Sequence, residues 1–405
     1  MAVNCPQPAE LLPVRGIRIA TMAAAIKSTE RDDLAVLLLS AEAKVSGVFT
    51  RSHFKAAPVQ LCEQYLGAGE PVGALVINSG NANAATGEPG LSDAREICDA
   101  VAQRFAVAGA VLPFSTGVIG ERLPVAKITE ALASGDAQES AAAWLAAARA
   151  IMTTDTVPKA VSAMLTVAGE PVNITGIAKG SGMIRPDMAT MLSYLACDAK
   201  IAQPLLDRLC AQLADASFNR ITVDGDTSTN DSFVLLATGQ ADHAEINSVT
   251  DAGYEALAAG LQSVAEELAQ RIVRDAEGAT KFVTISTKGG RSTEDCLAVC
   301  YTIAESPLVK TALFAADANW GRLCMAIGRA KATVDASKVS LHIGDHCIAR
   351  NGLMDDAYDE AIATAIMQQD EIAITCDLGL GAAQETVWTC DLSYDYVRIN
   401  AEYRT

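Results

Sequence analysis

Short runs of apolar residues separated by polar breaks characterise the first ninety residues of the chain, and they predict β-strands. LAVLLLS and KVSGVFT, both between residues 17 and 50, are two such runs. GALVINSGNANAATG, from Gly73 to Gly87, predicts a buried strand that ends in a loop of Asn, Ser and Gly. Because functional side chains often lie on loops held by a rigid sheet, Asn78, Ser79, Asn81 and Asn83 are candidates for a polar site.

Helical periodicity alternates with these strand patterns along the rest of the chain. The expected helices cover residues 91–106, 139–152, 201–216, 251–275, 306–316 and 355–367. The longest carries one apolar stripe, made of Leu257, Leu261, Val264, Leu268 and Ile272. Further strands are expected as a hairpin-like pair in 169–183, on both sides of a polar loop in 220–239, and at 371–378 and 385–392. Residues 280–290, TKFVTISTKGG, are expected to form a strand and a turn.

This mixed order of elements favours an α/β or α+β sandwich over a regular βαβ array. A chain of 405 residues is long enough for two or three domains. We place a boundary near Lys288-Gly289-Gly290, which predicts one domain over 1–288 and a second, smaller α/β domain over 289–405.

The composition describes a globular protein without a basic surface. Half of the residues are hydrophobic and the formal net charge is −18, which disfavours binding to nucleic acid. No apolar run reaches the roughly 18–20 residues of a membrane span, and the first residues do not form a secretory signal. We therefore expect a cytoplasmic protein that binds no membrane, in which Lys179 and Lys281 supply local positive charge for anionic small molecules.

The metal-binding residue types are too scattered to predict a metal site. The eleven cysteines form no CxxC pair, so we expect reduced structural thiols. His342 and His346 have a spacing of four, but the residues between them indicate a strand and a turn, which makes a zinc site a weak hypothesis.

Thr190 follows a small residue, Ala189, at the start of an apolar run in the segment KGSGMIRPDMATMLSYLACDA. A threonine hydroxyl is a poor nucleophile unless a base lies beside it, and the α-amino group of the same residue is such a base. That group titrates at roughly pH 7.7–8.0 and exists only if the Ala189–Thr190 bond is cut. The segment predicts a self-processing enzyme; the alternative is that MATML merely opens a buried strand or helix.

Three other polar motifs each allow a functional and a structural interpretation. STGVIG, Ser115 to Gly120, predicts a loop in which Thr116 and Gly117 supply a hydroxyl and a backbone N–H to an oxyanion, or it is a common turn. MTTDT, residues 152–156, is either part of a site or the cap that ends a helix. DGDTSTNDS, residues 224–232, holds three acidic residues that suit weak metal binding or polar turns equally well.

Taken together, these motifs resemble the ornithine acetyltransferase family of arginine biosynthesis, also called bifunctional glutamate N-acetyltransferase, over essentially the whole chain. The motifs that carry the resemblance, in the order of the family, are NSGNANAATG, STGVIG, MTTDT, KGSGM with MATML, DGDTSTNDS, EGATK, NWGR and YVRINAEYRT. Two departures are Asp187, where Asn is expected, and Ala318, where Pro is expected.

The resemblance implies an αββα sandwich of the type found in the DmpA aminopeptidases, followed by a smaller C-terminal domain. It implies autoproteolysis between Ala189 and Thr190, with the α and β fragments assembled as an α2β2 heterotetramer. It makes Thr190 the nucleophile and Thr116 and Gly117 the oxyanion pair. The substrate-binding residues that it implies are Thr153, Lys179, Thr190, Glu277, Asn400 and Thr405.

The implied reaction moves the acetyl group of N-acetylornithine to glutamate through an acetyl-threonine, with no cofactor and no metal. Acetyl-CoA is an open second donor. One alternative keeps the threonine nucleophile but uses water as the acceptor, which would make the protein an aminopeptidase or amidase. Another is a noncatalytic amino-acid-binding protein, which an uncut Ala189–Thr190 bond would favour.

Overall fold

The computed structural model describes residues 2–8, 10–27, 31–185 and 191–402. The chain forms two compact units. The first, here called the sandwich unit, comprises Pro6–Asn219 and Thr227–Ile272. The second, here called the C-terminal unit, comprises Met1–Cys5, Arg220–Asp226 and Val273–Thr405. The sequence-based boundary at residue 288 falls within a strand of the C-terminal unit.

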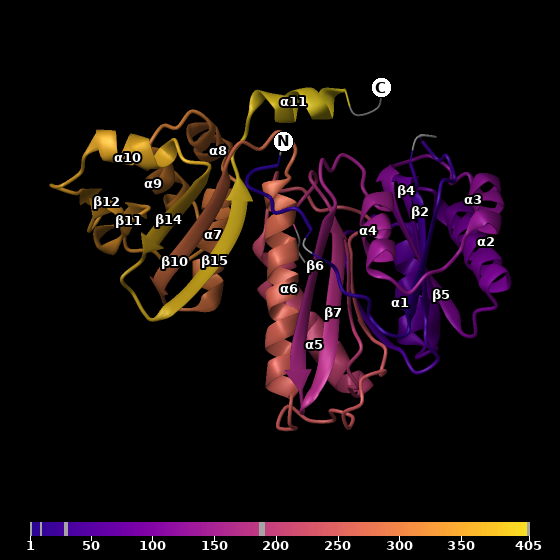
Figure 1. The fold of residues 1–405 in the computed structure, drawn as a ribbon. Helices are drawn as coiled ribbons and strands as arrows, with labels where there is room; N and C mark the ends of the chain where they lie inside the picture. Colours follow the sequence, from indigo (N-terminus) through magenta and orange to yellow (C-terminus); the bar gives the residue numbers. More distant parts are fainter. Residues whose placement is uncertain (1, 9, 28–30, 186–190, 403–405) are drawn as a thin grey trace. The chain divides into compact units, whose positions relative to one another are not determined.

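Two β-sheets form the middle of the sandwich unit (Figure 1). The four-stranded sheet has the order β1 (Ile17–Met22), β2 (Leu34–Leu39), β4 (Val72–Asn81), β5 (Ala110–Val118). The five-stranded sheet has the order β3 (Lys44–Phe49), β9 (Ser232–Ala237), β8 (Leu192–Cys197), β7 (Glu170–Lys179), β6 (Lys159–Val167). Among the described strand pairs of this unit, β4–β5 and β8–β9 are parallel and the others are antiparallel.

The two sheets pack through a shared apolar core. The Phe114 and Tyr194 rings, one from each sheet, meet edge to face with centroids 5.1 Å apart. Beside them, α1 (Ala57–Gly67) and α4 (Ala141–Ala150) fill the space between the sheets, and Trp144 of α4 is fully buried there. Aromatic pairs of this geometry stabilise a core by about 0.5–1.5 kcal/mol beyond the area they bury.

Helices cover the outer face of each sheet. On the four-stranded sheet these are α2 (Gly87–Phe105) and α3 (Val125–Ala131). On the five-stranded sheet they are α5 (Gln203–Ala216) and α6 (Tyr254–Arg274). Leu268 of α6 lies so close to Gly176 that a Cβ there would come within 2.7 Å of it. The order helix, sheet, sheet, helix confirms the predicted αββα sandwich.

The predicted pair of strands within residues 169–183 is wrong. That segment contains a single strand, β7, and its partner is the preceding strand β6. The turn between them is Ala168-Gly169, and both residues have positive φ, +50° and +92°. Alanine rarely adopts this conformation, so the turn gives only a weak signal in the sequence.

A six-stranded sheet organises the C-terminal unit. Its order is β13 (Leu353–Met354), β12 (His346–Arg350), β11 (Ser340–Ile343), β14 (Glu371–Asp377), β10 (Phe282–Gly290), β15 (Ala383–Cys390). The helices are α7 (Thr293–Ala304), α8 (Pro307–Phe314), α9 (Trp320–Gly328), α10 (Glu360–Met367) and α11 (Tyr394–Ala401). Residues of α7 to α10 form one core with the sheet.

Two helices of this unit, α7 and α9, were not expected from the sequence. The sequence of α7 is apolar around much of the helix and lacks a clear polar face, and α9 is only nine residues long. A strand expected from Arg220 onward is absent from the described residues, where only Ile221 makes an isolated bridge, to Trp388. The predicted helices at 306–316 and 355–367 are confirmed as α8 and α10, although α10 begins only at Glu360.

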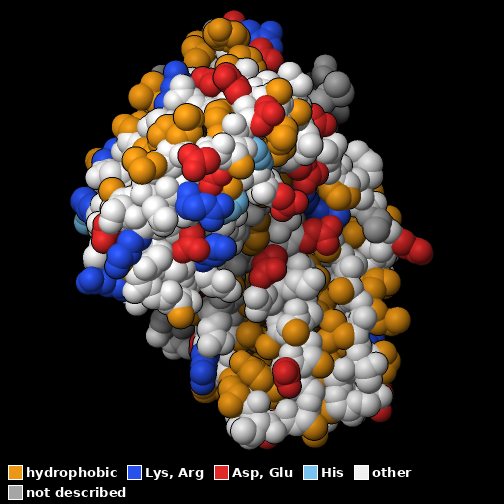
Figure 2. All heavy atoms as spheres, turned by 90° about the vertical axis from the view of Figure 1, so that its left-hand side faces the viewer, with side chains coloured by type: hydrophobic (Ala, Val, Ile, Leu, Met, Phe, Trp, Pro, Cys, Tyr) orange, Lys and Arg blue, Asp and Glu red, His pale blue; other side chains and the backbone are white. Residues whose placement is uncertain are grey.

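No single helix in the described part of the chain is long and apolar enough to cross a membrane, but α7 and α8 taken together, bent by 58° at the break between them, reach that length and apolarity. Their residues Val299, Ile303, Val309 and Leu313 belong to the core of the C-terminal unit. On the face shown in Figure 2, acidic and basic side chains are interspersed with apolar ones. The net charge of −18 is therefore not gathered into one acidic patch on that face.

Candidate active site

Thr116 and Gly117 lie at the carboxyl end of β5 and not in the loop that the sequence predicts, because β5 continues to Val118. There Gly117 is paired with Gly80 of β4, and the register of the two strands shifts at the next residue. Gly117 has φ +134°, and a Cβ on it would lie 2.3 Å from the carbonyl carbon of Gly80. The close approach of the two strands therefore requires glycine at position 117.

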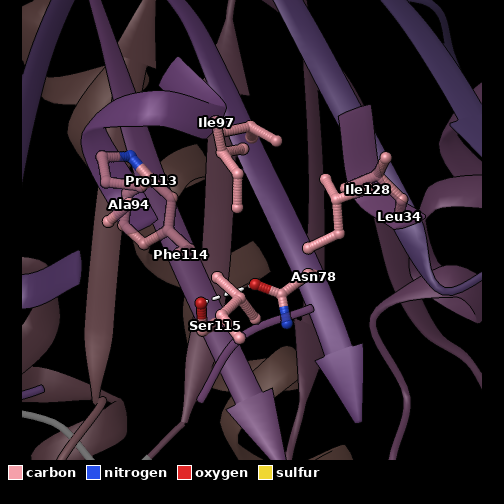
Figure 3. A pocket seen from close by; sticks show the side chains of 10 residues that line it. Leu34, Asn78, Ala94, Ile97, Pro113, Phe114, Ser115 and Ile128 are labelled. Carbon is pink, nitrogen blue, oxygen red and sulfur yellow. Dashed lines mark hydrogen bonds between the residues drawn. The ribbon is translucent and has the colours of Figure 1, made fainter. Parts of the chain in front are cut away.

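Side chains along β4 and β5 alternate between the two faces of the sheet, so the polar residues of these strands lie on both faces. Ser115 and Asn78 face α2 and α3, where the Ser115 hydroxyl donates to Asn78 Oδ1 at 2.5 Å (Figure 3). They border a void with room for about one water molecule, which is otherwise lined mainly by apolar side chains. Ser79 points the other way and donates to the carbonyl of Ala150 at the end of α4. The void is a packing defect, and the candidate site lies on the side of the sheet that faces its partner sheet.

Lys179, the last residue of β7, connects the two sheets at this point. Its Nζ donates to Thr116 Oγ1 at 3.2 Å. In the β7–β8 ladder Lys179 stands opposite Leu192, the second residue after Thr190 in the sequence. The carbonyl of Met191 accepts from the Ser232 N–H of β9 at 2.8 Å. The strand that follows Thr190 is thus held on both sides, next to the Lys179–Thr116 pair.

Asp155 is a fully buried carboxylate that organises the surroundings of Thr153 and Lys179. It accepts from the N–H of Thr153 at 2.9 Å and from the N–H of Gly180 at 2.7 Å. Lys159 Nζ donates to it at 2.6 Å, and both side chains of this ion pair have no exposed area. Through Asp155, the residues 152–156 after α4 are bonded to β6 and to the residue that follows β7, so they do more than cap the helix.

The electrostatics of Asp155 follow from this arrangement. Burial by itself would raise the pKa of the Asp155 carboxyl, but the ammonium groups of Lys159 and Lys179, with the N–H donors, hold that pKa well below its usual range. A second carboxyl behaves differently. Burial raises the pKa of Asp231 well above its usual range, although bonds from Ser228 and the charge of Lys179 oppose the shift.

A second group of candidate residues lies in the C-terminal unit. Asn400 of α11 donates through Nδ2 to Glu277 Oε2 at 2.8 Å and to the carbonyl of Tyr396 at 3.0 Å. The Tyr396 hydroxyl donates to Asp224 Oδ2 at 3.1 Å. Burial and the neighbouring Asp224 and Glu277 carboxylates raise the pKa of Tyr396. Glu277 and Asn400 are therefore in direct contact through a hydrogen bond.

The EGATK segment is fixed to the start of α11. The N–H groups of Thr280 and Lys281 donate to Asp391 Oδ1 at 2.8 and 3.0 Å, and the carbonyl of Gly278 accepts from Ser393 at 2.5 Å. Lys281, expected to attract anions, is buried, and its Nζ donates to the carbonyl of Gln369 at 3.1 Å.

The predicted site residues thus fall into two sets. The sandwich unit holds Thr116, Gly117, Thr153 and Lys179, and the C-terminal unit holds Glu277 and Asn400. Ala189, Thr190 and Thr405 lie outside the described residues. Asp155 and its partner Lys159 were not predicted. The only signal for them in the sequence is an acid and a base four residues apart, directly before an apolar run.

The two metal sites that the sequence weakly suggested gain no support from the described residues. Among these described residues, no group of three or more His, Cys, Asp or Glu side chains is placed to hold a metal ion. His342 and His346 lie on adjacent strands of a hairpin, β11 and β12. Burial raises the pKa of the Cys197 and Cys210 thiols to about 12, so these thiols are protonated at neutral pH.

Comparison with known proteins gives one family and several related structures. The model of the ArgJ family matches residues 18–405. An arginine biosynthesis bifunctional protein ArgJ from Bacillus halodurans is 38% identical, with 50% of this chain and 95% of that chain covered and a TM-score of 0.49. An ornithine acetyltransferase from Mycobacterium tuberculosis, solved with ornithine, is 33% identical, with 44% and 94% covered and a TM-score of 0.38.

An L-aminopeptidase D-Ala-esterase/amidase from Ochrobactrum anthropi is also similar, at 12% identity, with 67% of this chain and 89% of that chain covered and a TM-score of 0.39. All three TM-scores lie below 0.5, so the family assignment rests on the match to the family model over 388 of the 405 residues.

Proposed function

Because the chain belongs to the ArgJ family, and is thus an acetyltransferase of arginine biosynthesis, we propose that it transfers acetyl from N-acetylornithine to glutamate through Thr190. The observation that carries this proposal is the bond between Lys179 and Thr116 at the ends of β7 and β5. It places a cation and a hydroxyl donor beside the strand that begins two residues after Thr190.

The nucleophile is proposed to arise by self-cleavage between Ala189 and Thr190. The Thr190 hydroxyl attacks the Ala189 carbonyl, and the peptide bond is exchanged for an ester, which frees the α-amino group of Thr190. Water then hydrolyses the ester, which releases the Ala189 carboxylate and restores the Thr190 hydroxyl. The two family structures support this step. From the shares covered, their chains are about 213 and 190 residues long. Cleavage here would produce fragments of 216 and 189 residues.

Acetyl transfer then proceeds in two halves. In the first, Thr190 Oγ attacks the acetyl carbonyl while its α-amino group takes the hydroxyl proton and passes it to the leaving amine of ornithine. In the second, the amine of glutamate attacks the acetyl ester, and the hydroxyl of Thr190 is restored. No cofactor is required, because no electrons are transferred and the acyl group stays at the same oxidation level.

Thr116 and Gly117 are proposed to stabilise the oxyanion of both halves, through the Thr116 hydroxyl and the Gly117 N–H. One such donor contributes roughly 10²–10³ in kcat. The bond from Lys179 Nζ to Thr116 Oγ1 supports this role, because a hydroxyl that accepts from an ammonium directs its own hydrogen elsewhere. The register of β4 and β5 shifts directly after the Gly80–Gly117 pair, so the ladder is irregular beside the Gly117 N–H.

Substrate binding is assigned to both sets of candidate residues. Lys179 pairs with a substrate carboxylate, and Thr153 contributes a hydroxyl beside it. Glu277 accepts from the ammonium of the amino acid, and its bond to Asn400 orients the carboxylate. Thr405 is also assigned to substrate binding. We further propose that the fragments stay assembled as an α2β2 heterotetramer and act in the cytoplasm.

The decisive experiment measures N-acetylglutamate formation with N-acetylornithine and acetyl-CoA as separate donors, using the wild-type protein and Thr190→Ala. Acetyl-CoA is included because its thioester would form the same acetyl-threonine. We expect transfer from N-acetylornithine by the wild type and none by Thr190→Ala. Release of acetate without N-acetylglutamate would make the protein a hydrolase and overturn the proposal.

A further inference from the structure

Asn230 links the two sheets of the sandwich unit through one side chain. It is buried in the polar loop that precedes β9. Its Nδ2 donates to the carbonyl of Ala82 at 2.6 Å and to the carbonyl of Ser115 at 2.9 Å. Both acceptors belong to the four-stranded sheet or its immediate continuation, whereas Asn230 leads into the five-stranded one.

The orientation of the Asn230 amide is determined by its surroundings. The Thr229 hydroxyl donates to Asn230 Oδ1 at 2.6 Å, and two carbonyls face Nδ2, so the reverse orientation would place oxygen against oxygen. The Asn230 backbone is held as well, because its carbonyl accepts from Ser232 Oγ at 3.0 Å.

The groups that Asn230 holds lie where the β4–β5 ladder is irregular. Ser115 O belongs to the peptide group that precedes Thr116, and Ala82 follows Asn81, where the register shifts. β5 is the edge strand of its sheet, so a carbonyl on its outer side has no neighbouring strand of that sheet to bond. The amide of Asn230 bonds the Ser115 carbonyl and so constrains the backbone from which the Thr116 side chain projects.

The other end of the connection is the strand that follows Thr190. Ser232, two residues after Asn230, donates its N–H to the carbonyl of Met191 at 2.8 Å. Met191 and Thr116 are thus connected through Asn230. The Met191 carbonyl is bonded to Ser232, which lies two residues after Asn230 in the chain, and the Asn230 amide is bonded to the carbonyl of Ser115, the residue before Thr116.

We propose that Asn230 is a positioning residue for acetyl transfer: it sets the distance between the segment that carries the nucleophile and the Thr116–Gly117 oxyanion donors. The inference rests on the function proposed above. A small displacement of either partner is costly, because a misplacement of about 1 Å can reduce the rate by about 10²-fold. Substrate binding, in contrast, does not depend on this spacing to the same degree.

The test compares Asn230→Ala and Asn230→Asp with Asn173→Ala. Asn173 is the matched control, since its Nδ2 also donates to a distant backbone carbonyl, that of Pro13, at 2.9 Å. For each variant, thermal unfolding, the extent of self-cleavage and the kcat and KM for N-acetylornithine are measured. For both Asn230 variants we expect kcat to fall by about 10- to 100-fold with KM within about twofold of the wild type. Asn173→Ala should keep kcat within about twofold.

A milder pair of variants covers the case in which the Asn230 variants do not fold. Thr229→Val removes the hydroxyl that orients the amide, and Thr229→Ser retains it. We expect kcat to fall several-fold in Thr229→Val and to be restored in Thr229→Ser. Unchanged kcat in folded Asn230→Ala, or in Thr229→Val where Asn230→Ala does not fold, would refute the positioning role. If the wild type itself makes no N-acetylglutamate, the proposed function fails instead.

Discussion

The buried ion pair between Asp155 and Lys159 offers a strong test of how the site is held together. Asp155→Asn removes the negative charge while keeping the size of the side chain. It leaves the Lys159 ammonium, which has no exposed area, without its carboxylate. It also weakens the acceptor for the N–H groups of Thr153 and Gly180, so the change should affect stability and the site together.

The expected loss of stability follows from the burial of the pair. Removing one partner of a fully buried ion pair typically costs about 3–5 kcal/mol, because the other charge remains desolvated. For a unit of this size, each kcal/mol lowers Tm by about 2–4 °C, so Tm should fall by roughly 6–20 °C. Replacing both partners, in Asp155→Asn with Lys159→Met, should recover more than half of that loss, because no uncompensated charge remains.

The pH dependence provides an independent signature. Because the folded protein holds the pKa of Asp155 below its unfolded value of about 3.9, the carboxylate stabilises the fold above about pH 4. That contribution is lost as the pH falls further. The stability difference between the wild type and Asp155→Asn should therefore shrink below about pH 4, whereas between pH 5 and 8 it should stay constant.

Differential scanning calorimetry of the wild type, the single variant and the double variant measures these effects. Glu88→Gln is the control. It breaks the exposed pair of Glu88 with Arg95 and should change stability by no more than about 0.5 kcal/mol. A Tm for Asp155→Asn within about 2 °C of the wild type, or a double variant less stable than the single one, would refute the reasoning.

Three further predictions concern the catalytic and substrate groups. Thr116→Ala should lower kcat by roughly 10²–10³ without unfolding the protein; turnover near that of the wild type, in cleaved protein, would place the oxyanion site elsewhere. Glu277→Gln should raise the KM for N-acetylornithine, since an amide binds an ammonium less strongly than a carboxylate does, and an unchanged KM would argue against that role. Deletion of residues 402–405, or a C-terminal tag, should impair acetyl transfer far more than self-cleavage, with an N-terminally tagged protein as the control for both assays.

The elements that sequence reasoning located best are those whose signal is local and periodic. The stripe from Leu257 to Ile272 identified α6 within a few residues, and the apolar run after Thr190 corresponds to β8, in which every residue is buried. Helix α1 was not expected, although Pro58 at its start was a usable signal. Glycines at 80 and 117 suggested turns, whereas their positive φ values occur within paired strands.

The parts of the site that could not be predicted depend on contacts between distant residues. Gly180 lies 25 residues from Asp155, and the two carbonyls held by Asn230 lie 115 and 148 residues away from it. No periodicity or motif specifies such pairs, because they arise only when the two sheets pack together. Asn230 in the sequence looks like one more polar residue in a turn.

The most direct test of the account is the mass of the purified protein before and after incubation with N-acetylornithine. We predict two fragments, the second beginning TMLSY, and one acetyl group on that second fragment, attached to Thr190 and removed when glutamate is added. Thr190→Ala should remain one uncut chain that takes up no acetyl group. A wild-type chain that stays whole, or a cleaved one whose second fragment acquires no acetyl group that glutamate can remove, would contradict the account.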